Sequence, residues 1–77
     1  MNLKEHESVV LTRGRPESGL EAGDVGTIVH VHRDGAVFEV GFMTLTGRTI
    51  AVITVRTSDV RPVDQRDVSY VRQLSAA

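Results

Sequence analysis

Side chains that branch at the β-carbon most limit what this chain can fold into. Of its 77 residues, 13 are valines, seven threonines and three isoleucines, so 23 belong to this class. Such side chains are stiff at the first torsion and pack well on a pleated sheet. The strong helix formers leucine and alanine occur only five times each. Seven glycines separate the apolar runs, and short strands between turn residues are typical of small barrels and sandwiches.

The apolar runs predict five strands, at residues 8–12, 24–32, 36–42, 48–55 and 60–63. Residues 33–35 contain an Asp-Gly pair, which favours a tight hairpin, and residues 57–59 predict a short turn, with one turn of 3₁₀ helix as one form of it. Gly26 lies early in the second strand and indicates a bulge or a close backbone approach. Pro62 confines the last strand to an edge of the sheet.

These elements predict an all-β fold, namely a small five-stranded antiparallel SH3-like barrel at residues 1–63. An OB-like barrel and an open meander are the alternatives. Residues 64–77 form a separate tail without glycine. Val68, Val71 and Leu74 recur in it every three residues, which is a weak helical stripe. The tail either frays in solution or orders on a partner.

Two strands indicate which side chains should face the core. The third alternates cleanly, so Ala36, Phe38, Val40 and Phe42 are expected inside. The fourth is apolar on both faces, with Ala51, Ile53 and Val55 on one and Ile50 and Val52 on the other. An antiparallel sheet normally has one polar face. Either the strand's curl or the tail covers Ile50 and Val52, or these residues bind a partner.

Length and charge narrow the function classes. A chain of 77 residues with a net charge of −1 is a single domain without a strongly basic nucleic-acid footprint. It has no cysteine, which excludes disulfides and thiolate chemistry and fits a reducing cytosol. No apolar run is long enough to span a bilayer, and the polar start of the chain does not resemble a secretory signal. We therefore expect a cytoplasmic protein.

Chemistry-bearing residues form no recognisable catalytic or cofactor motif. His30 and His32 are two apart on a predicted strand, so they share a face and could begin a metal site with His6 or Glu39. One such pair without a third ligand at a recognisable spacing predicts no metal. No Gly-x-Ser-x-Gly and no phosphate-binding glycine loop occurs. The sequence thus predicts neither an enzyme nor a bound cofactor.

Several phrases of the sequence resemble known families. Residues 20–31, LEAGDVGTIVHV, are similar to the opening of KOW-like modules and to the SH3-like domain of nitrile hydratase β-subunits. Residues 5–63 resemble a family of small bacterial proteins called domain of unknown function 4926, through VVLTRGRPESGLEAGDVGTIVHV, FEVGF and GRTIAVITV…DVRPV. The resemblance implies an SH3-like barrel for which no catalytic residues are described. It also implies a small accessory protein, in some cases beside toxin-like neighbours.

We therefore expect a protein–protein interaction module, the small and antitoxin-like partner of a larger bacterial protein, with a homodimer as one version. Besides the loop at residues 13–21 and the tail, the expected partner-binding residues are Arg15, Arg48, Ile50, Val52, Thr54 and Tyr70. A KOW-like nucleic-acid-binding module is the alternative. The arginines near the loops favour it, but only three residues are aromatic, and both phenylalanines are expected in the core.

Overall fold

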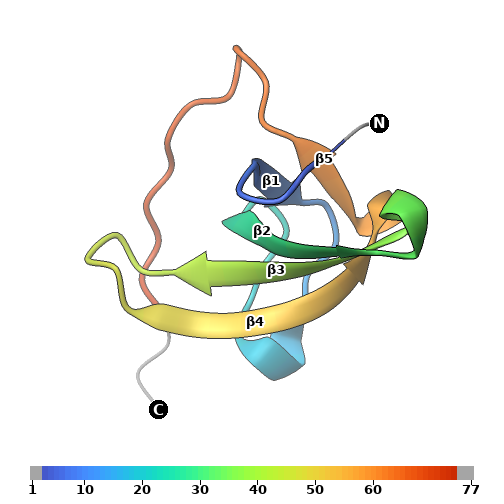
Figure 1. Ribbon diagram of the computed structural model, residues 1–77. Helices are drawn as coiled ribbons and strands as arrows, with labels where there is room; N and C mark the ends of the chain where they lie inside the picture. The colour runs from blue at the N-terminus through green and yellow to red at the C-terminus, as the bar shows by residue number, and fades with distance from the viewer. Residues whose placement is uncertain (1–2, 75–77) are drawn as a thin grey trace.

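A computed structural model describes residues 3–74 and shows a single antiparallel sheet (Figure 1). Its order is β4-β3-β2-β1-β5, so β1, β2 and β3 each pair with the next strand along the chain, whereas β5 pairs with β1. Three 3₁₀ turns join the strands: η1 at Pro16–Ser18, η2 at Arg33–Gly35 and η3 at Thr57–Asp59. The strands are β1 at Ser8–Leu11, β2 at Val25–His32, β3 at Val37–Met43, β4 at Thr49–Arg56 and β5 at Val60–Pro62.

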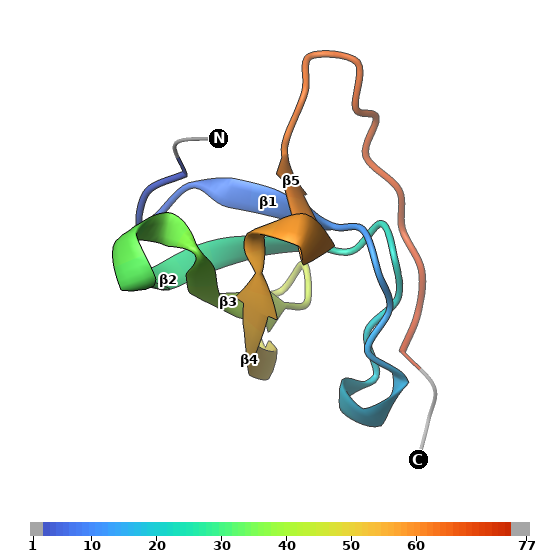
Figure 2. The ribbon, with the colours of Figure 1, turned by 90° about the vertical axis from the view of Figure 1, so that its right-hand side faces the viewer.

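The predicted all-β class and the five antiparallel strands are confirmed, as is the 3₁₀ turn before β5. The sheet curls around its core in the manner of a small barrel (Figures 1 and 2). It is not closed, however, because β4 pairs only with β3 and β5 only with β1. The expected closed barrel is therefore corrected to an open, barrel-like sheet. Pro62 lies on an edge strand, as predicted.

The core lies inside the curl and is entirely apolar among the described residues. Phe38 and Phe42 are the largest fully or almost fully buried side chains, and Val40 lies between them on the same face of β3. These three were predicted correctly. Ala36 was not, because its amide donates a hydrogen bond to the carbonyl of Arg33 and so belongs to the turn. Ala36 is accordingly exposed, and β3 begins one residue later.

A β-bulge in β4 decides where Ile50 points. Phe42 pairs with Ala51, but the next residue of β3, Met43, pairs with Thr49, which leaves Ile50 without a partner. An extra residue of this kind interrupts the alternation of a strand. Ile50 is therefore half-buried against the core, and the predicted exposed face shared by Ile50 and Val52 is wrong for Ile50. Val52 points outward as predicted, with 55% of its surface exposed.

A second bulge lies in β2. The pairing with β3 shifts between Ile28 and His30, so Val29 has no partner. Val29 is exposed, although strict alternation from Val31 would turn it inward. Both bulges thus place an apolar residue on the side opposite to that expected from alternation.

The tail after β5 contains no helix in its described part, residues 63–74. It rises from β5, turns, and runs back beside the loop between β1 and β2 (Figure 2). The expected helical stripe is therefore wrong for these residues, and residues 75–77 lie outside the described chain. A helix this short is marginal without packing, and Val68, Tyr70 and Val71 are all exposed. No helix of the described residues is long and apolar enough to cross a membrane.

Candidate functional site

The returning tail forms one wall of an apolar groove, which we call the tail groove. The opposite wall is the loop between β3 and β4, and Figure 1 shows the tail descending beside this loop. The groove has a volume of about 580 Å³. It is lined by Leu20, Asp24, Val25, Phe42, Thr44, Leu45, Thr46, Ile50, Tyr70, Val71, Arg72, Gln73 and Leu74.

The floor and the walls of the tail groove differ in how firmly they are held. Leu20 and Phe42 belong to the buried core, and Ile50 packs against it. Leu45 and Tyr70 stand on the two walls and keep 90% and 86% of their surface exposed. The groove therefore joins a rigid apolar floor to apolar side chains that remain free to make further contacts.

Arg72 anchors the tail to the rest of the domain. Its Nε donates to Asp24 Oδ1 at 2.9 Å, and its Nη2 donates to Asp24 Oδ2 at 2.5 Å. Nη2 also donates to the carbonyl of Gly19 at 3.1 Å, and Nη1 lies 3.5 Å from Glu21 Oε2. The side chains of Arg72 and Asp24 keep only 20% and 18% of their surface exposed. Two parallel hydrogen bonds between guanidinium and carboxylate are among the strongest polar contacts of proteins.

Asp24 is held ready for this contact by its own loop. Its Oδ2 accepts a hydrogen bond from the amide of Glu21 at 2.9 Å, and its amide donates to the carbonyl of Glu21 at 3.1 Å. The hydrogen bonds from Arg72, more than that from the Glu21 amide, hold the pKa of Asp24 below its ordinary value. Asp24 is therefore an oriented carboxylate that stays ionised well into the acidic range.

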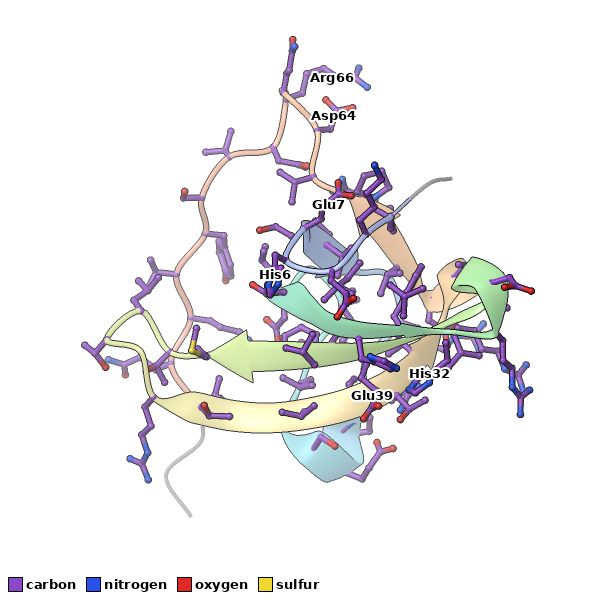
Figure 3. The ribbon with its side chains drawn as sticks, viewed as in Figure 1. His6, Glu7, His32, Glu39, Asp64 and Arg66 are labelled. Atoms are coloured by element: carbon purple, nitrogen blue, oxygen red, sulfur yellow. The ribbon has the colours of Figure 1, made fainter. Side chains whose placement is uncertain are left out.

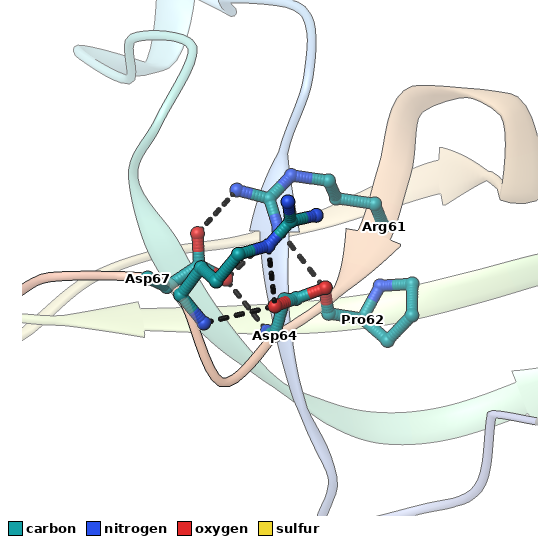
Figure 4. A network of polar contacts seen from close by, with 5 residues as sticks. Arg61, Pro62, Asp64 and Asp67 are labelled. Carbon is teal, nitrogen blue, oxygen red and sulfur yellow. Dashed lines mark hydrogen bonds and ion pairs between the residues drawn. The ribbon is translucent and has the colours of Figure 1, made fainter.

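A second ion pair shapes the start of the tail (Figure 4). Arg61 donates to both carboxylate oxygens of Asp67, at 2.9 Å and 2.7 Å. The amide of Asp64 also donates to Asp67, at 2.6 Å. These contacts, Arg61 foremost, lower the pKa of Asp67 to about 2. They turn the chain back toward the domain, with Asp64 and Arg66 at the tip of the turn (Figure 3).

The structure divides the predicted partner-binding residues into two groups. Ile50 and Tyr70 both line the tail groove. Arg48 is exposed in the adjoining loop, where its amide donates to Thr44 Oγ1 at 3.0 Å. Thr54 and Val52 are exposed on the edge strand β4 instead.

Arg15 lies with this second group, at the free edge of β4. Its Nη2 donates to the carbonyl of Thr54 at 3.1 Å and lies 3.9 Å from Asp59 Oδ2. Arg15 thereby occupies a backbone group of an edge that another strand could otherwise pair with. It also lines a hollow of about 520 Å³ with Arg33 and Arg56.

The two histidines of β2 share a face, as predicted. The ring centroids of His30 and His32 lie 4.2 Å apart, and His32 Nε2 lies 2.7 Å from Glu39 Oε2 (Figure 3). His30 faces Glu5, with 3.9 Å between Nδ1 and Oε2. Within residues 3–74, no three His, Asp or Glu side chains are arranged to hold a metal ion. We therefore interpret this cluster as a polar outer face of the sheet.

Among the residues of the tail groove that sequence reasoning did not single out are Asp24, Leu45 and Arg72, although Arg72 lies in the tail that was expected to bind a partner. Asp24 was assigned to the start of the second predicted strand, and Leu45 lies between the third and fourth predicted strands. The signal for Arg72 was a single basic residue between the apolar residues Val71 and Leu74. No local pattern connects it to Asp24, because 48 residues separate the two in the sequence.

Comparison with protein-family models places the sequence of this chain in a family. The model of a domain of unknown function, DUF4926, matches residues 5–62. The chain belongs to this family. All five strands of the DUF4926 domain lie within the matched residues, and so do the floor of the tail groove and Asp24. The tail that carries Arg72 follows the matched part. Searches of curated proteins and of solved structures returned no match.

Proposed function

We propose that this DUF4926 protein is a non-catalytic protein–protein interaction module, the small accessory partner of a larger bacterial protein. The tail groove carries the proposal. Its rim exposes Val25, Leu45 and Tyr70 beside a floor that belongs to the core. Contiguous exposed apolar side chains of this kind mark interaction sites on soluble domains.

Binding at the groove would follow ordinary interface physics. A partner that covers Val25 and Leu45 removes apolar surface from water without moving the floor, so little conformational order is lost in the sheet itself. Thr44 and Thr46 on the loop would provide part of the polar rim that surrounds such a patch. The expected occupant is therefore another protein surface with an apolar centre.

The test is capture of partners from the native host, followed by affinity measurement with the captured protein. Leu45→Asp should weaken binding roughly 10- to 100-fold, because a buried leucine contributes about 1.5–3 kcal/mol. Val68→Asp is the matched control, since Val68 is as exposed as Leu45, at 88% against 90%, but does not line the groove. Capture that is equally strong with both variants would contradict the groove as the binding surface.

A third variant separates the groove from the outer side of β4. Val52 was the other residue expected to bind a partner, and it stays exposed on the edge strand. Val52→Asp should leave the affinity within about twofold if the groove alone is used, and a large loss would instead assign binding to β4. The Leu45, Val68 and Val52 variants should all keep the fold, because none of these side chains is part of the core.

Nucleic-acid binding is the second candidate, and the hollow beside β4 favours it. Arg15, Arg33 and Arg56 line this hollow together with His32 and with Asp59, whose carboxylate lies 3.9 Å from Arg15. Phosphate contacts by such arginines would make affinity fall steeply with salt, because bound counterions are released. An RNA and DNA mobility-shift assay at 50 mM and 200 mM salt checks this. Binding at low salt that Arg33→Ala and Arg56→Ala abolish would support this candidate.

Two finer features belong to the same proposal. An antitoxin-like role, suggested by the family resemblance, would be supported if the captured partner were a toxic protein that this chain neutralises on co-expression. We also place the interaction in the cytoplasm, since a chain without cysteine suits a reducing compartment.

A further inference from the structure

The seat of Arg72 in the tail groove is built from hydrogen-bond acceptors. Two carboxylate oxygens of Asp24 and the carbonyl of Gly19 accept from its guanidinium, and the Glu21 carboxylate lies 3.5 Å away. The Glu21 amide orients Asp24 from behind. A guanidinium presents a planar fork of donors that fits this arrangement, whereas an ammonium is a point charge and would satisfy fewer of the acceptors at once. The seat therefore fits a guanidinium better than an ammonium.

Apolar neighbours complete what the seat recognises. Tyr70, Val71 and Leu74 line the groove on the tail side. Opposite them lie Leu20, Phe42 and Ile50, which form the floor. Residues 70–74 of the tail thus place an arginine between apolar residues. This segment contains neither helix nor strand.

The tail itself is held lightly. In the described chain, residues 68–74 make no backbone hydrogen bond to the sheet, and their side-chain hydrogen bonds come from Arg72 alone. Tyr70, Val71 and Leu74 remain 86%, 68% and 43% exposed although they border an apolar groove. Ordering such a segment costs conformational entropy that one ion pair must offset. The tail is therefore in a position to be displaced.

We propose that the floor of the tail groove, its wall between β3 and β4 and the Asp24 seat bind an extended segment of a partner protein that carries an arginine between apolar residues, in the place that the chain's own tail occupies until this segment displaces it. The proposal rests on the proposed interaction function and specifies the partner's recognition element. Charge complementarity selects the occupant, because the seat is acidic and the tail shows which cation it accepts. A tethered tail competes at an effective concentration on the order of millimolar. The partner's segment must therefore bind the site tightly enough to outcompete a tail present at that concentration.

The test measures binding of a synthetic peptide to the full chain. The peptide VSYVRQL copies residues 68–74. Amide chemical shifts of the isotope-labelled protein detect affinities down to millimolar and report on Leu20, Val25 and Ile50 in the groove. The protein forms are the wild type, Arg72→Gln and the double variant Asp24→Asn with Arg72→Gln. Control peptides are VSYVQQL and VSYVKQL.

We expect Arg72→Gln to bind VSYVRQL at least tenfold more tightly than the wild type does, because its own tail has lost its anchor. We expect VSYVQQL and VSYVKQL to bind this variant at least fivefold more weakly, and the double variant to lose the preference for arginine. Equal affinity for the three peptides, or equal affinity of wild type and Arg72→Gln for VSYVRQL, would overturn the proposal. Dispersed, wild-type-like spectra of each variant verify its fold.

Two further outcomes separate this inference from others. If Leu45→Asp releases the captured partner but the peptides show no arginine preference, the interaction function stands and the arginine seat fails. If peptide binding behaves as expected but Leu45→Asp captures the partner normally, the seat stands and the proposed function fails at this surface. A concentration-dependent dimer of the wild type that Arg72→Gln abolishes would identify a second copy's tail as the occupant, contrary to the proposal.

Discussion

Gly26 occupies a place where two strands leave no room for a side chain. A β-carbon built there would lie 2.6 Å from Val40 Cγ1, 2.8 Å from Phe42 Cε2 and 2.9 Å from the carbonyl oxygen of Gly41. Carbon atoms in contact are normally about 3.5–4.0 Å apart. The glycine in β2 therefore allows β3 to approach closely, which keeps Val40 and Phe42 in the core.

Gly26→Ala should destabilise the domain by about 1–3 kcal/mol, the usual cost of overpacking a close-packed core. Urea unfolding followed by circular dichroism measures the effect. Gly41→Ala is the matched control, because the nearest atom to its β-carbon, Val29 Cγ1, lies 3.6 Å away in ordinary contact. Equal unfolding midpoints for the two variants would show that Gly26 is not a packing requirement.

At the scale of elements, backbone torsions and contacts within a few residues explain the turns and the edge strand. A contact between residues far apart in the sequence explains the return of the tail to the domain. The turn η2 places Arg33, Asp34 and Gly35 at φ values of 50°, 56° and 92°. Asp and Gly tolerate this left-handed region better than other residues. The turn at the start of the tail is also local, because Arg61 and Asp67 are six residues apart. The return of the tail to the domain depends on the Arg72–Asp24 ion pair, which joins residues 48 positions apart.

The Arg72–Asp24 pair predicts that acid releases the tail. Arg72 lowers the pKa of Asp24 in the folded chain, so the stabilisation is complete above the ordinary aspartate pKa of 3.8 and is lost as pH falls through the lowered value. Tyr70 is the only tyrosine and there is no tryptophan, so intrinsic fluorescence reports on the tail. We expect its anisotropy to fall below about pH 4 while the β-sheet circular dichroism is retained.

Asp24→Asn is the control for this titration. Its tail should be mobile at neutral pH already, so its anisotropy should be low and nearly flat between pH 7 and pH 3. A wild-type transition centred above pH 5, or an unchanged transition in Asp24→Asn, would mean that another group holds the tail.

At the scale of the whole molecule, stability comes from one small apolar core. Phe38 and Phe42 are its largest members, and no polar or charged side chain of the described residues is buried with them. A folded chain of 77 residues is stable by about 4–12 kcal/mol if each residue contributes about 0.05–0.15 kcal/mol. A substitution that leaves a large cavity in the core would therefore remove much of this free energy of unfolding.

Phe38→Ala should cost about 3–5 kcal/mol and leave the protein partly unfolded at 37 °C. Met43→Ala is the comparison on the same strand, because Met43 is 57% exposed and its truncation should change stability by less than about 1 kcal/mol. Thermal unfolding followed by circular dichroism distinguishes them. Similar melting temperatures for the two variants would contradict a core centred on Phe38.

The elements that could be predicted from sequence are those whose cause lies among chain neighbours. Valine-rich runs between glycines predicted the five strands, Thr57–Asp59 was expected to turn, and Pro62 placed β5 at an edge. Each depends on torsional preference or on a missing backbone donor, which act within a few residues. Two of the expected partner residues, Ile50 and Tyr70, do meet in one groove.

Only the tertiary structure decided where Ile50 points and where the tail goes. A bulge shifts the register of β4 against β3, and register depends on the partner strand as well as on the bulged one. The Asp24–Arg72 contact joins residues 48 positions apart, so no spacing rule connects them. Local sequence determined the strands because steric preference is local. The groove required the assembled sheet, because its walls come from distant parts of the chain that meet only when the sheet has curled.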